Sequence, residues 1–201
     1  MSEFANARSR NLVKPVLEIL AGIPTIVYGF FAITVITPLL KATILPELGT
    51  FSALSAGIVV GILILPLIAS LTEDALRAVP RGLREGAYAM GATRWETVRK
   101  VLLPAAISGI AAAVILAMSR AVGETMAVVL AAGTNPNLTF NPMDSVQTMT
   151  AFIVQISLGD TPADSIQFKA LFAVGATLFA MTFALNLIST WVVAKYRNEY
   201  D

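Results

Sequence analysis

Two ionisable residues interrupt an otherwise apolar stretch of the sequence. Arg120 and Glu124 lie within residues 105–132, next to the polar residues Ser119 and Thr125. A lone charge deep in a bilayer costs roughly 2.5–3.5 kcal/mol on insertion scales, so intramembrane charges usually serve a function. A guanidinium group suits phosphate because its planar fork donates paired hydrogen bonds. These four polar side chains are therefore predicted to line a substrate pathway for an anion.

Two roles for the charged pair are compatible with the sequence. Residues four apart lie on one face of a continuous helix, so Arg120 and Glu124 could form a purely structural salt bridge. Alternatively, Arg120 offers a transient counter-charge to an anion, and Glu124 holds the guanidinium when no anion is present. Only the second role places the pair on a transport path.

The elements that would carry this pair are four apolar stretches, each long enough to cross a bilayer, which takes about 20 residues. The chain has 201 residues, of which 13% are charged, against about 25% in soluble domains. None of the stretches alternates with the two-residue period of a membrane barrel. An all-α polytopic membrane protein is expected, with spans at residues 15–40, 51–71, 105–132 and 167–194.

The basic residues predict how these spans are oriented. Of the 14 lysines and arginines, three precede residue 15, six lie in residues 72–103 and two follow residue 194. With four spans these three segments share one side of the membrane, and basic residues concentrate on the cytoplasmic side. Both ends of the chain and the loop 72–103 are therefore expected to be cytoplasmic.

The composition excludes several kinds of chemistry. The sequence has no cysteine and no histidine, which excludes disulfides, Cys/His zinc sites and thiol nucleophiles. No Gly-x-x-x-x-Gly-Lys-Ser/Thr phosphate loop is present, so ATP hydrolysis is not expected of this chain. The spans hold no clustered carboxylates, which makes a membrane-embedded enzyme a poor fit. No catalytic residue and no metal site are predicted.

The cytoplasmic loop 72–103 is predicted to be helical. Glu73 and Asp74 favour the first turn of a short helix through the helix dipole. Residues 82–90 form a second short helix, and Gly91 can adopt the positive φ that ends it. Thr93 and Glu96 have the spacing of a capping box, which predicts that another helix begins at this point.

The external loop 133–166 is predicted to contain a short helix over residues 144–158. Asp144 or Ser145 is the expected first residue, since both types accept hydrogen bonds from the first turn of a helix.

A spaced motif connects the cytoplasmic loop to a known family. Residues 85–87 read Glu-Gly-Ala, three residues separate them from Gly91, and after nine more residues comes Val-Leu-Leu-Pro at 101–104. This resembles the EAA loop of ABC importer permeases, with the pattern Glu-Ala-Ala, three residues, Gly, nine residues, Ile-x-Leu-Pro. Two positions depart from that pattern, where Gly86 replaces alanine and Val101 replaces isoleucine.

The resemblance implies that this loop forms coupling helices that dock on a cytoplasmic ATPase subunit. Small residues would let the partner approach, apolar residues would anchor it, and a glutamate would pair with a basic residue. The coupling residues implied are Glu85, Gly86, Ala87, Met90, Gly91 and Trp95. The alternative is an amphipathic helix on the membrane surface whose basic residues only fix the topology.

A second motif narrows the family. Residues 120–128 read Arg-Ala-Val-Gly-Glu-Thr-Met-Ala-Val, and they resemble phosphate-specific ABC permeases, the PstC type more than the PstA type. Residues 21–29 and 147–151 are similar to the same type, so the resemblance covers nearly the whole chain. It implies the type I ABC importer permease fold over residues 1–201. That family normally has six spans, so the first two family helices are expected to be missing before Met1.

The resemblance also implies partners. They are a second homologous permease subunit, a cytoplasmic ATP-binding subunit dimer that binds ATP and Mg, an external phosphate-binding protein, inorganic phosphate and membrane lipid. No cofactor in this chain and no nucleic acid are expected. The implied location is the inner membrane of a bacterial or archaeal cell. The alternatives are an importer for another oxyanion (sulfate, molybdate or phosphonate) and an ATP-independent anion channel or transporter.

Overall fold

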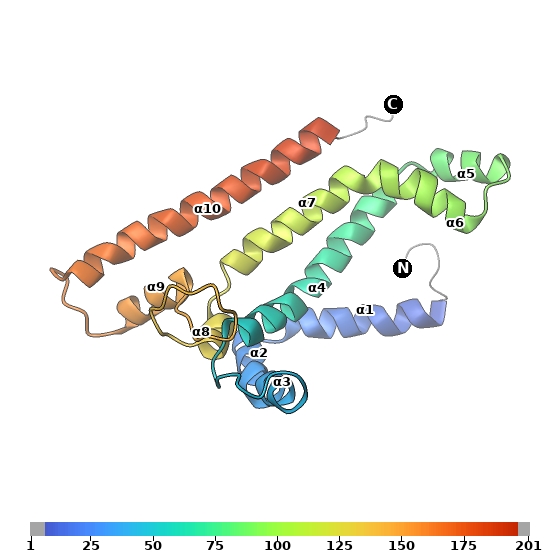
Figure 1. Cartoon of the computed structure of the whole chain (residues 1–201). Coiled ribbons are helices and arrows are strands. Elements are labelled where there is room, and N and C mark those ends of the chain that lie inside the picture. The colour runs from blue at the N-terminus through green and yellow to red at the C-terminus, as the bar shows by residue number, and fades with distance from the viewer. Residues whose placement is uncertain (1–6, 197–201) are drawn as a thin grey trace. The chain divides into compact units, whose positions relative to one another are not determined.

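The computed structural model describes the backbone of residues 7–196 and the side chains of residues 12–195. All regular secondary structure in that part of the chain is helical (Figure 1). The chain forms two compact units. One contains the residues up to Ala21, Leu65–Ser119 and the residues from Ala184 on, and the other contains Gly22–Ile64 and Arg120–Phe183. Arg197, one of the basic residues assigned to the cytoplasmic side, lies outside the described residues.

Within the described chain, four helices are long and apolar enough to cross a membrane. They are Thr25–Thr43, Ala53–Ala78, Arg94–Val122 and Ile166–Lys195. This confirms the all-α class and the predicted number of spans. The last of them belongs to α10 (Ile166–Tyr196) and agrees closely with the predicted span 167–194.

The first span begins later than predicted. α1 (Ala7–Gly22) is a separate helix, and the membrane helix starts only at α2 (Thr25–Phe31). The cause is Pro24, which precedes α2 with a ψ of 137° and disfavours helical backbone at the residue before it. The span then continues through a π-helical turn (Ala32–Ile36) and α3 (Thr37–Thr43).

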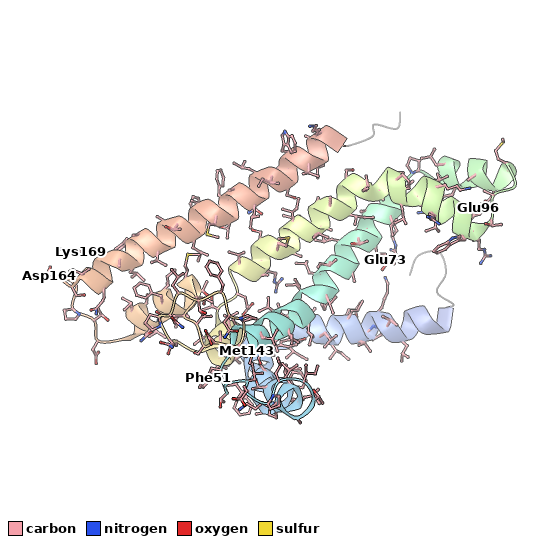
Figure 2. All side chains as sticks on the ribbon, viewed as in Figure 1. Phe51, Glu73, Glu96, Met143, Asp164 and Lys169 are labelled. Atoms are coloured by element: carbon pink, nitrogen blue, oxygen red, sulfur yellow. The ribbon has the colours of Figure 1, made fainter. Side chains whose placement is uncertain are left out.

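α4 (Ala53–Ala78) is longer than predicted and includes the two acidic residues expected to begin a separate short helix. Within α4, Arg77 Nη2 contacts Glu73 Oε1 at 2.5 Å, and Lys14 Nζ of α1 lies 3.9 Å from the same oxygen. Glu73 thus pairs with cations inside a helix and does not start one (Figure 2). The prediction of a new helix at Glu73 and Asp74 is wrong.

In the second unit, α2 and α8 (Met126–Ala132) approach each other at a glycine. A Cβ atom added at Gly29 would lie 2.9 Å from Leu130 Cβ and 3.0 Å from both the Cα and the carbonyl oxygen of Ala127. Tyr28, next to this glycine, is also buried. The contact between the two helices therefore depends on a missing side chain.

Gly29→Ala is expected to destabilise this unit by about 1–3 kcal/mol, the usual cost of overpacking a close contact. The measurement is the midpoint of thermal unfolding in detergent. The matched control is Gly57→Ala in α4, where a Cβ atom meets nothing within 4 Å. Because alanine is a better helix former than glycine, the control should be neutral or slightly stabilising. Equal midpoints for the two variants would contradict the expected clash.

The loop between α8 and the next helix of this unit is held by one carboxylate. Asp144 accepts hydrogen bonds from Thr139 Oγ1 at 2.8 Å and from Asn141 Nδ2 at 2.9 Å. Its backbone oxygen also accepts the N–H of Ala53 at 3.0 Å, which satisfies a donor in the first turn of α4. Asp144 therefore organises the loop and does not begin the next helix.

The helix predicted over residues 144–158 begins later than predicted. α9 runs from Met149 to Leu158, and its N-cap is Thr148, whose side-chain oxygen accepts from the N–H of Ala151 at 3.2 Å. The predicted start at Asp144 or Ser145 is wrong because Asp144 is bound to the loop.

Candidate functional site

The third predicted span is divided into two helices. α7 (Leu103–Val122) ends before α8, and residues 123–125 between them are not helical. The N–H groups of Gly123 and Glu124 each donate at 3.1 Å to a carbonyl three residues back. Such bonds tighten the last turn and end the helix. Gly123 is also a poor helix former, which favours the break at this point.

This break changes the relation between the two charged residues. Arg120 lies exposed in the last turn of α7, whereas Glu124 is half-buried beyond the end of that helix. Both are among the described residues, and no ion pair joins them. The expectation that they share one helix face is wrong, since that face exists only in a continuous helix. The pair therefore does not form the structural salt bridge considered from the sequence.

Side chains from two segments satisfy the backbone of the break. Thr150 Oγ1 of α9 donates to the carbonyl oxygen of Glu124 at 2.9 Å, and Thr150 is only 5% exposed. Thr125 Oγ1 donates to the carbonyl oxygen of Gly123 at 3.2 Å. Non-helical backbone at membrane depth is tolerated where protein groups satisfy it or where it lines a polar cavity.

Thr150 is a residue of this site that sequence reasoning did not assign. It is 26 positions from its partner Glu124, so no local pattern connects the two. The signal in the sequence is the pair of threonines at 148 and 150, which stand at the start of an apolar helix.

Two of the four predicted pathway residues, Glu124 and Thr125, form part of the break. The other two precede it in α7, where Arg120 is exposed and Ser119 is half-buried. The Glu124 carboxylate is 3.5 Å from the N–H of Ala127, which is long for a hydrogen bond. A helix interrupted among polar groups is the arrangement in which several transporters bind substrate and ions.

Residues 81–102 form a helical hairpin in the first unit (Figure 1). α5 (Arg81–Ala89) ends before Met90, and Gly91 follows with a φ of +82°, which confirms the predicted left-handed conformation. α6 (Arg94–Thr97) then passes through a π-helical turn (Val98–Leu102) into α7. Because any residue with a Cβ atom is strained at positive φ, Gly91 suits the sharp reversal between α5 and α6.

Most of the predicted coupling residues lie on the surface of this hairpin. Met90 is 89% exposed and Trp95 62% exposed, and Glu85, Gly86 and Gly91 are also exposed. Ala87 differs, since it is half-buried on the inner side of α5. Two large apolar side chains beside small residues form a surface that could seat a partner.

The predicted capping box at the start of α6 is confirmed. The Thr93 side chain accepts from the N–H of Glu96, and the Glu96 carboxylate accepts from the N–H and the hydroxyl of Thr93. These bonds from Thr93, followed by the ammonium of Lys100 at 3.4 Å, lower the pKa of Glu96 below its usual value.

The lowered pKa of Glu96 predicts how the start of α6 depends on pH. The ionised carboxylate stabilises the cap above its usual pKa, and this stabilisation is lost as pH falls through the lowered pKa. The titration can be followed by the carboxyl ¹³C shift of glutamate in labelled protein. Thr93→Ala, which removes one donor to the carboxylate, should move the pKa of Glu96 up. A Glu96 titration that is the same in both proteins would contradict the role of the Thr93 hydroxyl.

Comparison with known proteins gives consistent relatives. The chain is 39% identical over 196 residues to the probable ABC transporter permease protein YqgH of Bacillus subtilis. The aligned region covers 97% of this chain and 62% of that protein. It is 33% identical to the phosphate transport system permease protein PstC of Haemophilus influenzae, over 97% of this chain and 67% of that protein. The chain thus spans roughly two thirds of the length of these relatives or slightly less.

A solved structure supports the fold. The structure described as inward-facing conformations of the MetNI methionine ABC transporter matches with a TM-score of 0.73 and 22% identity, over 96% of this chain and 78% of that one. Residues 1–198 match the family described as "Binding-protein-dependent transport system inner membrane component". With its four membrane helices and this match over nearly its whole length, the chain belongs to the family of binding-protein-dependent transport system inner membrane components.

Proposed function

We propose that this chain is a transmembrane permease subunit of an ATP-driven importer of inorganic phosphate. The observation that carries the proposal is Arg120, an exposed guanidinium in the last turn of the third membrane helix, directly before the helix break. Several relatives are named as phosphate transport permeases, including PstC proteins of Haemophilus influenzae and Methanocaldococcus jannaschii. A paired-donor cation suits a phosphate oxyanion better than a point charge does.

In the proposed mechanism, this chain forms half of the translocation path and a second homologous permease subunit forms the other half. An external binding protein delivers phosphate, and a cytoplasmic dimer of ATP-binding subunits holds ATP and Mg. Closure of that dimer moves the hairpin of α5 and α6, which switches access to the path from outside to inside. Arg120 then meets the anion transiently, and Glu124 limits how long it stays through charge repulsion.

The proposed orientation places the hairpin of α5 and α6 and both ends of the chain in the cytoplasm of a bacterial or archaeal cell. It is supported by the concentration of basic residues in these segments. Lipid contacts the apolar outer faces of the membrane helices. No nucleic acid takes part.

The test is phosphate uptake in cells that lack their own high-affinity system. The chain is expressed together with its partner permease, ATPase and binding protein. Uptake of labelled phosphate that requires the ATPase is expected, and it should withstand an excess of sulfate, molybdate or phosphonate. Flux that continues without the ATPase would instead indicate a channel.

A second candidate substrate class follows from one observation. The Bacillus subtilis relative, which is 39% identical, is named only as a probable ABC transporter permease, so its name leaves the substrate open. An importer of another oxyanion would use the same guanidinium. In the competition experiment above, this candidate predicts that one of the competing oxyanions is carried in place of phosphate.

A further inference from the structure

α5 carries an arginine, Arg84, that is not part of the surface proposed to bind the ATPase. Arg84 is half-buried, and its Nη2 donates a 2.7 Å hydrogen bond to the carbonyl oxygen of Leu76. Leu76 lies in the last turn of α4, where carbonyl groups lack a donor within the helix. The guanidinium therefore caps α4 at the end where the helix dipole places partial negative charge.

Apolar packing surrounds this hydrogen bond. Val79, Leu102 and Ala106 form a buried cluster, and Leu76 and Leu83 pack against it. Leu83 precedes Arg84 on α5, so neighbouring residues of one helix contact the cluster and the end of α4. This part of the first unit thus joins α5 to two membrane helices, α4 and α7.

The packing between these two membrane helices is also close. A Cβ atom added at Gly109 of α7 would lie 2.7 Å from Ala75 Cβ of α4. Ala75 directly precedes Leu76, so the tight contact between α4 and α7 lies next to the carbonyl that Arg84 caps. A movement of α4 toward α7 at this point would bring the two helices into steric clash unless α7 moved as well.

We propose that Arg84 is a positioning residue that transmits movement of α5 to α4. The inference rests on the proposed function, in which an ATPase subunit binds the exposed face of the hairpin. Apolar contacts are non-directional, so the cluster alone lets α5 slide on its neighbours. A charge-assisted hydrogen bond fixes both distance and direction. Arg84 makes α4 follow α5 when the ATPase moves the hairpin.

The first experiment measures coupling in the complete importer in proteoliposomes, as phosphate transported per ATP hydrolysed. Arg84→Met keeps the aliphatic stem and removes every donor. It is expected to lower this ratio by about tenfold, the effect of losing one charged hydrogen bond, while ATP hydrolysis continues. Arg84→Lys, which can still donate to the Leu76 carbonyl, should recover most of the ratio.

The matched control is Arg81→Met. Arg81 is on the same helix and carries the same charge, but it is exposed, so its loss should leave the ratio unchanged. A wild-type ratio in Arg84→Met would overturn the proposal. So would an equal loss in Arg81→Met, because the effect would then come from charge alone.

The second experiment needs no substrate. The chain has no cysteine, so spin labels can be placed at Asp74→Cys on α4 and Ala89→Cys on α5, both at exposed positions. Pulsed electron resonance should give a narrow distance distribution with Arg84 and a broad one with Arg84→Met. Equal widths would overturn the proposal even if transport falls.

The two experiments separate failure of the inference from failure of the proposed function. If the wild-type importer carries no phosphate, the function is wrong, and the label distances still decide the role of Arg84. If Arg84→Met does not assemble with the ATPase, Arg84→Leu replaces it, since leucine also has no donor and is a good helix former. A ratio for Arg84→Leu that equals the wild type would also overturn the proposal.

Discussion

Arg120→Gln is expected to lower phosphate uptake by about 10- to 100-fold, the range for losing hydrogen bonds to a charged group. Glutamine has a similar length but carries no charge and has no paired donors. Arg120 is exposed at the end of α7 and forms no ion pair with Glu124. Its replacement therefore does not leave a buried carboxylate without its counter-charge. The measurement is the initial rate of labelled phosphate uptake, normalised to assembled importer.

Two variants show whether this loss belongs to the anion. Arg120→Lys keeps the charge without the planar fork and should fall between wild type and Arg120→Gln. Arg99→Gln removes an exposed arginine outside the apolar part of the chain and should change uptake little. If Arg120→Gln transports phosphate at the wild-type rate, Arg120 is not on the path.

Gly86→Leu is expected to weaken binding of the ATPase subunit by about 10- to 100-fold, because a side chain forced into a close-packed contact costs about 1–3 kcal/mol. Gly86 is exposed on α5, and a Cβ atom there meets nothing within 4 Å. The chain itself can therefore accept the larger residue, and leucine is a better helix former than glycine. Co-purification of the ATPase with tagged permease measures the loss.

Gly86→Ala is the matched control for this prediction. Alanine stands at this position in the EAA pattern that the loop resembles, so the variant should retain the ATPase. Neither substitution should lower the unfolding temperature, since the new side chain points away from the chain. Retention of the ATPase by Gly86→Leu would show that the partner does not approach α5 at this residue.

The sequence predicted those features that depend on local chemistry or on length. The four spans follow from apolar length, and they are present. The left-handed Gly91 and the capping box of Thr93 and Glu96 follow from the conformations and bonds that those residue types allow. In each case the interaction partners lie within a few residues of one another.

The features that were missed depend on more distant or competing partners. The helix break at Gly123 is held partly by the Thr150 hydroxyl, 26 positions away from its acceptor. Asp144 does not begin α9, because Thr139 and Asn141 already occupy its carboxylate. The preference of acidic residues for a first helical turn is only about 0.3–1 kcal/mol, and at Glu73 cation pairing within α4 outweighs it.

The close approach at Gly29 limits how this protein can vary over evolutionary time. Two of the three atoms nearest to an added Cβ belong to the backbone of Ala127, and only the third is a side-chain atom, of Leu130. A second substitution could shrink Leu130, but no change of residue type moves the Ala127 backbone out of the way. In a library in which positions 29 and 130 are randomised together, functional clones should keep glycine at 29 whatever residue they carry at 130.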